Sequence, residues 1–255
     1  MWKGEMVSVV VTSYREKGSI RAAIEGFFSV PSVDEVVVVD NNAETGSVEE
    51  VKKTKARLVF EKQQGHGWAL QRGFREAKGE YIVIVEGDGT FSAGDIEKLL
   101  QYGEIQSVVF GTRTNKGTME RGALGNGTWG ALRRWADILE AQIIEILFST
   151  NRLTDVGCTY SLLRKDVVAV LENRWIKGGS HFVTEIRLQA AAAKIPFVEI
   201  PVIFKNRTIG SSYVVGTRWK LTKEGAKMLM FIITFWLRAK VFSRKRYRPI
   251  NLAKS

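Results

Sequence analysis

Short apolar runs alternate with amphipathic segments along the first 110 residues of the chain. Continuous apolar runs, typical of strands buried on both faces, occur at residues 7–12, 35–39, 57–60, 81–85 and 107–110. Segments with a helical period lie between them, at residues 19–28, from residue 46 onward, and at residues 67–77 and 93–100. Because strands that alternate with helices form βαβ units, the sequence predicts an α/β domain around a mainly parallel sheet.

The pattern changes after residue 111. Residues 112–128 are rich in Gly, Thr, Asn and Arg, and this connection is long enough to predict a mobile active-site loop. Residues 129–148 then have a helical pattern with one apolar stripe, made of Trp129, Leu132, Trp135, Leu139, Ile143, Ile146 and Leu147. Residues 195–204 contain Pro196 and Pro201, which favour an extended segment at the edge of the sheet.

Composition narrows the class of protein. The 255 residues, 45% of them hydrophobic, are enough for one α/β domain with an appendage. The single cysteine, Cys158, excludes an internal disulfide and favours a reducing compartment, and the presence of only two histidines argues against a histidine-rich metal site. The first six residues lack the apolar core of a signal peptide, so we expect the chain in the cytoplasm.

Positive charge is concentrated at the C-terminal end. Residues 225–255 hold eight of the 38 Lys and Arg residues and none of the 27 Asp and Glu residues. They also hold a ten-residue apolar core, 228–237, which is short of the roughly 20 residues that span a bilayer. We divide the chain into a domain of residues 1–215 and a tail of residues 216–255, which fits a helix lying at an anionic membrane surface. A helix packed on the sheet explains the tail nearly as well, whereas no helix-turn-helix, zinc-finger or RNA-binding motif suggests nucleic acid.

The strand predicted at residues 81–85 ends in Glu86-Gly87-Asp88. Two carboxylates at the C-terminal end of a central parallel strand lie where open α/β sheets bind their ligands. Mg2+ and Mn2+ prefer oxygen ligands, often one or two carboxylates together with phosphates of the substrate. The sequence therefore predicts that Glu86 and Asp88 hold Mg2+ or Mn2+ at a diphosphate site. The alternative is that they cap the helix that follows.

Residues 65–91 carry a series of short motifs around this acidic pair. They read Gly-x-Gly, Ala-Leu, Gly-Phe, Ala-x-Gly-Glu-Tyr-Ile and then acidic-x-Asp. This order resembles the inverting family-two glycosyltransferases, which have the GT-A fold, and is similar to their dolichol-phosphate mannose synthase branch. The resemblance covers about residues 5–215. Where that family has Asp-x-Asp, this chain has Glu86 at the first position.

The resemblance implies that the protein moves a hexose, of the mannose or glucose type, from a GDP- or UDP-linked sugar to a polyprenyl or dolichyl phosphate. It implies a single displacement with inversion, dependence on Mg2+ or Mn2+, and a place on the cytoplasmic face of a membrane. The donor-binding residues that it implies are Thr12, Tyr14, Glu16, Asp40, Gly65, His66 and Gly67. These assignments have alternatives. Thr12, Tyr14 and Glu16 could form an ordinary polar loop, Asp40 could cap a turn, and His66 could be a loop residue without a binding role. Where the family has a second Asp after Asp40, the chain has Asn41.

The resemblance also implies residues on the acceptor side. Four residues match segments that face the acceptor phosphate, to which a planar guanidinium is suited: Arg113, Arg121, Arg207 and Ser211. Three carboxylates match catalytic positions of the family: Asp88, Asp155 and Glu185. A phosphate monoester has a second pKa of about 6 and is already anionic near neutral pH, so either Asp155 or Glu185 could orient groups instead of acting as a base. Any one of the arginines, taken alone, is better explained as a solvated surface charge.

Three other functions remain open. A family-two transferase that acts on a glycan or small-molecule hydroxyl would need Asp155 or Glu185 as an essential base. A sugar-nucleotide nucleotidyltransferase would have a Gly-rich basic loop after the first strand, where this chain has Ser13-Tyr14-Arg15-Glu16. A non-catalytic, membrane-associated subunit that binds a sugar nucleotide would explain the departures from the family at Glu86, Asn41 and Cys158.

Overall fold

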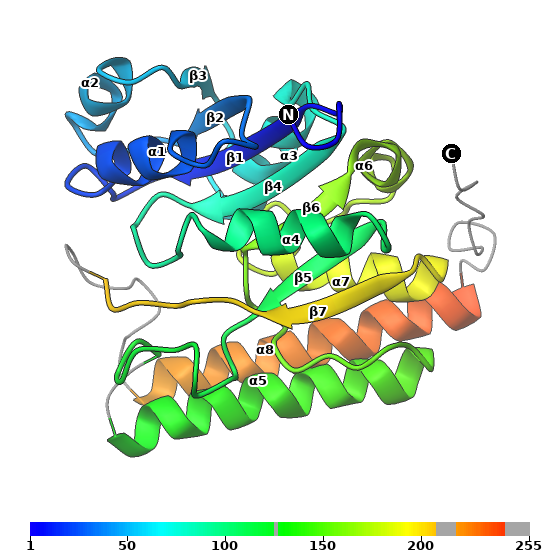
Figure 1. Ribbon diagram of the computed structural model, residues 1–255. Coiled ribbons are helices and arrows are strands. Elements are labelled where there is room, and N and C mark those ends of the chain that lie inside the picture. The colour runs from blue at the N-terminus through cyan, green and yellow to red at the C-terminus, as the bar shows by residue number, and fades with distance from the viewer. Residues whose placement is uncertain (125–126, 208–217, 243–255) are drawn as a thin grey trace.

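The computed structural model describes residues 1–124, 127–207 and 218–242. These residues form one seven-stranded sheet in the order β3-β2-β1-β4-β6-β5-β7 (Figure 1). Strand β6 is antiparallel to both of its neighbours, and the other pairs are parallel, so the predicted, mainly parallel sheet is confirmed. The strands are β1 Val7–Ser13, β2 Glu35–Asp40, β3 Arg57–Phe60, β4 Tyr81–Glu86, β5 Val108–Thr112, β6 Ser161–Arg164 and β7 Phe197–Pro201.

Helices cover both faces of the sheet. The core on one face includes residues of α1, α2 and α4, and the core on the other face includes residues of α3, α5, α6, α7 and α8 (Figure 1). Successive residues of a strand point to opposite faces, so Val10 lies in one core and its neighbours Val9 and Val11 lie in the other. The helices are α1 Ile20–Phe28, α2 Ser47–Lys52, α3 His66–Glu76, α4 Asp95–Gly103, α5 Gly127–Phe148, α6 Lys165–Glu172, α7 Phe182–Ala193, α8 Arg218–Leu237 and the π-helical turn η1 Arg238–Phe242.

The five strands and the helices predicted between them are present, with ends shifted by a few residues. Strand β7 lies at the edge of the sheet, as its prolines predict. The pattern along the chain predicts neither β6 nor α7. Strand β6 has only four residues, and α7 is buried on nearly every side. A helix surrounded by protein has no polar face and therefore shows no apolar stripe.

Helix α5 is the helix predicted at residues 129–148, and much of its apolar stripe faces outward. Four stripe residues are between 54% and 77% exposed: Leu132, Trp135, Leu139 and Ile146. The positions that enter the core are Ala141, Ile144 and Phe148, all in the second half of the helix. Helix α5 therefore has apolar side chains on its solvent side from Leu132 to Ile146.

Helix α8 comes from the predicted C-terminal tail and packs beside α5 (Figure 1). Its Ile232 and Phe235 are buried in the same core as α5, and Trp236 Nε1 donates a hydrogen bond to the Leu147 carbonyl at 2.8 Å. The tail thus contributes a helix that is packed on the domain. None of the helices that the structure describes is both long and apolar enough to cross a membrane. The boundary predicted at residue 215 lies outside the described residues and stays a prediction.

Candidate functional site

The carboxyl ends of β1, β2 and β4 meet at one edge of the sheet. Strand β1 lies between the other two, and its register pairs Thr12 with Glu86 of β4 and Ser13 with Asp40 of β2. The chain leaves β1 toward β2 on one side and returns beside β1 as β4 on the other. Such a reversal of strand order opens a crevice at the carboxyl ends, where α/β sheets bind ligands. Three predicted donor-side or metal-site residues thus lie on adjacent strands.

The acidic pair Glu86 and Asp88 is held by protein hydrogen bonds. Glu86 Oε1 accepts a hydrogen bond from Thr159 Oγ1 at 2.9 Å. Asp88, which is 2% exposed, accepts hydrogen bonds at Oδ1 from the backbone N–H of Thr90 at 3.0 Å and from its hydroxyl at 2.6 Å. Asp88 Oδ2 forms an ion pair with Arg207 Nη2 at 2.5 Å. The structure therefore joins a predicted metal ligand directly to a predicted acceptor arginine.

Glu16 adds a third carboxylate near this pair. Burial raises the pKa of Glu16, and the negative charges of Glu86 and Asp88 raise it further, although a hydrogen bond from the Tyr14 backbone N–H opposes the shift. Among the described residues, no group of three His, Cys, Asp or Glu side chains is arranged to hold a metal ion by itself. Two carboxylates completed by substrate phosphates and water are an ordinary set of ligands for Mg2+ or Mn2+. The residues present therefore fit such an ion.

Asp40 and Asn41 organise the turn after β2. Asp40 Oδ1 accepts the backbone N–H of Ala43 at 2.7 Å, which is the turn-capping contact expected as the alternative to a donor-binding role. The Asn41 amide donates to two backbone carbonyls in the 61–63 segment and accepts the N–H of Gly65 at 2.7 Å. A second Asp at this position would accept hydrogen bonds but could not donate them. The departure from the family pair thus has a local structural reason that sequence reasoning missed.

The Gly-x-Gly motif begins α3 where the chain packs against the loop before α7. Gly65 has φ +148°, and a Cβ there would lie 2.3 Å from the carbonyl oxygen of Gly178. A Cβ on Gly67 would lie 2.6 Å from Phe182 Cβ. The N–H of Trp68 donates to the same Gly178 carbonyl at 2.9 Å. Close packing therefore requires both glycines, and a contact of this turn with the donor diphosphate stays a prediction.

His66 is the first residue of α3 and has an unsatisfied nitrogen. Its Nε2 is buried and has no hydrogen-bond partner among the described residues. Burial lowers the pKa of His66, and the negative charge of Glu86 partly opposes that shift. A buried polar atom without a partner is unfavourable unless something satisfies it. A ligand beside the acidic pair would provide such a partner.

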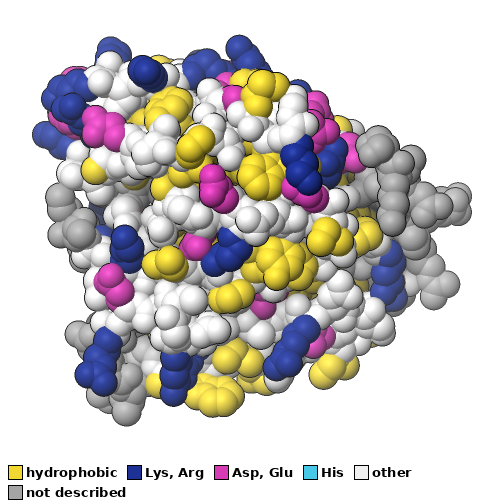
Figure 2. All heavy atoms as spheres, viewed as in Figure 1, with side chains coloured by type: hydrophobic (Ala, Val, Ile, Leu, Met, Phe, Trp, Pro, Cys, Tyr) yellow, Lys and Arg dark blue, Asp and Glu magenta, His cyan; other side chains and the backbone are white. Residues whose placement is uncertain are grey.

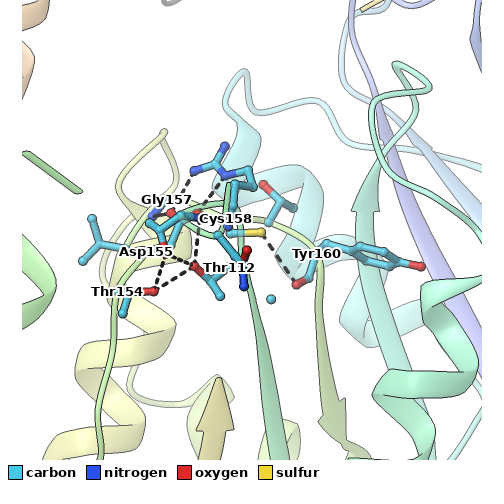
Figure 3. Close-up of polar contacts among 12 residues, drawn as sticks. Thr112, Thr154, Asp155, Gly157, Cys158 and Tyr160 are labelled. Carbon is cyan, nitrogen blue, oxygen red and sulfur yellow. Dashed lines mark hydrogen bonds and ion pairs between the residues drawn. The ribbon is translucent and has the colours of Figure 1, made fainter. Parts of the chain in front are cut away.

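Arg113 and Asp155, both predicted from the resemblance, form a buried, bidentate ion pair. Figure 3 shows Asp155 with the polar contacts around it. Arg113 Nε and Nη2 each lie 2.8 Å from a different carboxylate oxygen of Asp155, and the Arg113 backbone N–H adds a bond of 2.9 Å. Gly157 N–H also donates to Asp155, at 3.0 Å. Burial alone would raise the pKa of Asp155, but the charge and hydrogen bonds of Arg113 outweigh it and hold that pKa well below its usual range. These contacts suit Asp155 to orienting Arg113 and make it a weak base.

Glu185 lies on α7 and is completely buried. Its carboxylate accepts the backbone N–H groups of Ile176 at 2.8 Å and Lys177 at 2.7 Å, together with a bond from the Gln189 amide at 3.1 Å. Burial raises the pKa of Glu185, and these hydrogen bonds partly offset that effect. In the structure Glu185 anchors the segment before α7, and a catalytic role for it stays a prediction.

Of the two remaining predicted residues, Arg121 lies in a segment beside that of Arg207, and Ser211 lies outside the described residues. Arg121 is exposed, and its carbonyl accepts a hydrogen bond from the Asn206 amide at 3.2 Å. The backbone N–H of Asn206 also donates to Glu120 at 2.8 Å, so the segment of Arg121 runs beside the segment of Arg207. Ser211 lies in 208–217, outside the described residues.

The inner side of α5 carries a polar row that sequence reasoning missed. Arg133, Asp137 and Glu140 are spaced four and three residues apart and lie on the opposite side from the exposed apolar stripe. Burial, reinforced by the charge of Asp155, raises the pKa of Asp137 to about 6. The guanidinium of Arg133 is within electrostatic range of Glu86. The signal was the helical spacing of polar residues between apolar ones, which marks a second face of the helix.

Glu140→Gln is expected to stabilise the protein at alkaline pH. Burial, reinforced by the charge of Asp137, raises the pKa of Glu140 to about 8. A carboxyl group whose folded pKa exceeds its unfolded value of 4.5 costs no stability below pH 4.5; the cost grows between pH 4.5 and the folded pKa and stays constant above it. The free energy of unfolding of the variant should therefore exceed that of the wild type by about 1–3 kcal/mol near pH 9 and by much less near pH 5. Urea denaturation at the two pH values measures this, and equal differences at both would contradict it.

The chain is similar in sequence to a family of known enzymes. Residues 8–170 match the family model described as glycosyl transferase family 2. A dolichol-phosphate mannosyltransferase from Saccharomyces cerevisiae is 26% identical over 90% of this chain and 92% of its own length. An undecaprenyl-phosphate mannosyltransferase from Micrococcus luteus is 23% identical over 84% of this chain and 94% of its own length.

One group of solved structures shares the fold. Glucosyl-3-phosphoglycerate synthase from Mycobacterium tuberculosis, in complex with Mn2+, uridine diphosphate and glucosyl-3-phosphoglycerate, matches with a TM-score of 0.67 at 16% identity. The match covers 92% of this chain and 80% of that chain. The predicted GT-A fold is confirmed, and at this identity the likeness concerns the fold alone.

Proposed function

Since the chain belongs to glycosyl transferase family 2, we propose that it transfers a hexose from a nucleoside-diphosphate sugar to the phosphate of a polyprenyl or dolichyl phosphate, with inversion. The names of the relatives from S. cerevisiae and M. luteus support this class of acceptor. The observation that carries the proposal is the contact between Asp88 and Arg207. It joins a carboxylate suited to the metal–diphosphate of the donor with a guanidinium suited to the acceptor phosphate, so the two substrates would meet at one edge of the sheet.

On the donor side, Glu86 and Asp88 would hold Mg2+ or Mn2+, which would offset the charge that builds on the leaving nucleoside diphosphate. The similar M. tuberculosis structure contains Mn2+ with uridine diphosphate. The hydroxyls of Thr159 and Thr90 orient the two carboxylates. Preorganised groups of this kind lose little free energy in reorganising during the reaction. The donor nucleotide would lie along residues 12–16, Asp40 and the start of α3.

On the acceptor side, an oxygen of the lipid phosphate would attack the anomeric carbon while the bond from that carbon to the diphosphate breaks. A phosphate monoester is already anionic near neutral pH, so no side chain has to remove a proton. Arg113 would bind the phosphate together with Arg121, Arg207 and Ser211, and Asp155 would hold Arg113 in place. Among the described residues, Nη1 of Arg113 has no hydrogen-bond partner, so a donor of this arginine is available for the phosphate.

The experiment that tests the proposal is donor consumption by the purified protein with Mn2+ or Mg2+, using GDP- and UDP-linked sugars with and without a short polyprenyl phosphate. Consumption that requires the lipid phosphate and is abolished by a chelator would support it. Metal-dependent consumption that ignores the lipid would favour transfer to a glycan or small-molecule hydroxyl. Donor binding without any consumption would favour the non-catalytic subunit.

We also propose that α5 and α8 rest together on a membrane surface. The exposed apolar side chains of the two adjacent helices, which we call the α5–α8 face, are Leu132, Trp135, Leu139, Ile146, Met230, Ile233 and Leu237. Exposed Lys223 and Lys227 lie on α8, and exposed Arg238 begins the π-helical turn η1 that follows it. Figure 2 shows Lys and Arg side chains beside hydrophobic ones along the lower edge of the molecule, where these helices run. Apolar side chains accompanied by basic ones suit an interface with anionic lipid.

Leu139→Ser combined with Ile146→Ser is expected to weaken binding to vesicles that contain anionic phospholipid by about tenfold or more. Each substitution removes an apolar side chain whose burial contributes about 1.5–3 kcal/mol when complete. Co-sedimentation with vesicles measures the change. Ile105→Ser is the matched control, because Ile105 is 74% exposed against 77% for Ile146 but lies between α4 and β5. Equal loss in the control and the double variant would remove the α5–α8 face from the proposal.

A further inference from the structure

Glu199 on strand β7 holds the turn that carries Asp155. Its Oε2 accepts hydrogen bonds from the backbone N–H and the hydroxyl of Thr154, each at 2.7 Å. Its Oε1 accepts the backbone N–H of Asp155 at 3.1 Å. Three donors of two adjacent residues thus converge on a single carboxylate. Asp155 in turn forms the bidentate ion pair with Arg113, so a path of contacts leads from Glu199 through Asp155 to Arg113.

A second path leads from Glu199 to the backbone on either side of Arg113. The hydroxyl of Thr154 lies 2.8 Å from the hydroxyl of Thr112 (Figure 3). It also lies 2.7 Å from the hydroxyl of Thr114. Because Thr154 has one hydroxyl proton and Glu199 accepts it, Thr154 can only accept from the other two hydroxyls. Thr112 and Thr114 are the immediate neighbours of Arg113 in the chain. Glu199 therefore braces Arg113 through its side-chain partner and through both flanking residues.

Burial, hydrogen bonds and nearby charges act on the ionisation of Glu199 in opposite directions. Arg187, fully buried on α7, donates to the backbone carbonyls of Val183 and Cys158 and has no ion pair with a carboxylate among the described residues. The positive charge of Arg187 lowers the pKa of Glu199, and the negative charge of Asp155 raises it. Burial is the larger effect and raises the pKa of Glu199 to about 7, against the hydrogen bonds of Thr154. Arg187 and Glu199 thus interact electrostatically with the buried pair of Arg113 and Asp155.

We propose that Glu199 is a positioning residue for the acceptor, which acts through Thr154 and Asp155 to hold the Arg113 guanidinium in the orientation that binds the acceptor phosphate. The inference rests on the proposed function, in which Arg113 faces the acceptor. It predicts a specific kinetic signature: loss of Glu199 should weaken the acceptor side of the reaction and leave the donor side, on β1, β2 and β4, unchanged.

The test is steady-state kinetics of Glu199→Gln with each substrate varied in turn. Gln keeps the shape of the side chain but replaces one acceptor oxygen by an N–H2 group that would face the N–H of Thr154 or Asp155. The KM for the acceptor should rise about tenfold or more, whereas the KM for the donor should stay within about twofold. Equal changes in both values, or no change in a folded variant, would overturn the proposal. Glu172→Gln is the control, because Glu172 is a carboxylate on α6 that pairs with Arg75 and should leave both values unchanged.

A second variant guards against misfolding of the first. Thr154→Val removes the hydroxyl that links Glu199 to Thr112 and Thr114 and leaves both backbone bonds to the carboxylate in place. It should raise the acceptor KM in the same direction but by less. An unchanged acceptor KM in a folded Thr154→Val protein would exclude the hydroxyl path.

A rescue measurement separates the need for a carboxylate from a general loss of structure. A pocket of about 350 Å³, lined in part by Thr114, Arg152, Thr154 and Glu199, opens beside the carboxylate. Added formate should therefore restore the acceptor KM of Glu199→Ala, and chloride at the same concentration should not. Rescue by neither anion, or by both, would count against the proposal. If wild-type protein instead uses a different acceptor, the proposed function is wrong, and the same comparison of KM values for that acceptor tests Glu199.

Discussion

Asp88→Asn is expected to lower metal-dependent consumption of the donor by about a hundred- to thousandfold. The buried Asp88 carboxylate is one of two hard oxygen ligands available at the carboxyl end of β4, and the neutral amide would bind Mg2+ or Mn2+ poorly. Without the ion, the charge that develops on the leaving diphosphate is no longer offset, and losing one such electrostatic contact typically costs a factor of this size. Initial rates over a range of Mn2+ concentrations measure the effect.

Two further variants make the Asp88 result specific. Asp95 is also buried and ion-paired, with Lys98 at 2.8 Å, but lies at the start of α4. Asp95→Asn should alter stability and leave the dependence on metal unchanged. Arg207→Gln frees Oδ2 of Asp88 and should tighten metal binding while it weakens binding of the lipid phosphate. Full metal-dependent turnover by folded Asp88→Asn would contradict the assignment of the metal site.

Asp155→Asn is expected to lower the free energy of unfolding by about 3–5 kcal/mol, because it removes the negative partner of a buried arginine. Arg113 is only 7% exposed, and its ion pair with Asp155 is bidentate. An uncompensated charge in this position loses its hydration without gaining a partner. Urea denaturation at neutral pH measures the loss. The surface pair Arg75–Glu172 is the control, and Glu172→Gln should change the free energy of unfolding by about 1 kcal/mol or less.

The same ion pair predicts a pH dependence of stability. The folded pKa of Asp155 is depressed below its ordinary value of 3.8, so the stabilisation is complete above that pH and is lost as the pH falls toward the folded pKa. Asp155→Asn should therefore differ from the wild type most near neutral pH and least in strong acid. A double variant, Asp155→Asn with Arg113→Gln, should lose less than the sum of the two single variants, because neither charge is then left alone. Additive losses would show that the two side chains are not coupled.

Several features of this protein follow from consecutive residues alone. The run at 81–85 is apolar at every position, and a segment of that kind is stable as a strand only when both faces are covered. The charges of Glu86 and Asp88 then have to lie where the strand emerges from the core, at the edge where open α/β sheets generally bind ligands. The prolines near β7 likewise restrict that strand to an edge, because they cannot donate to a neighbouring strand.

Other features depend on residues that are far apart in the chain. Asp155 and Glu185 both look like candidate bases as single positions, but Arg113, the partner of Asp155, is 42 residues away. Glu199 reaches the same turn from 45 residues away. No local sequence pattern predicts such partners, since they depend on which elements the sheet brings together. The outward direction of the α5 stripe has the same origin, because only the packing of α5 on α8 decides which side of the helix is covered.

The sequence by itself determined the alternation of strands and helices, the mainly parallel sheet and the position of the acidic pair, because the hydrophobicity of consecutive residues shows which segments are buried. Only the tertiary structure decided which carboxylates are bound by arginine or backbone N–H groups, which pKa values burial shifts, and which apolar side chains stay exposed. Those properties arise from desolvation and from contacts between distant segments, and both exist only once the chain has folded.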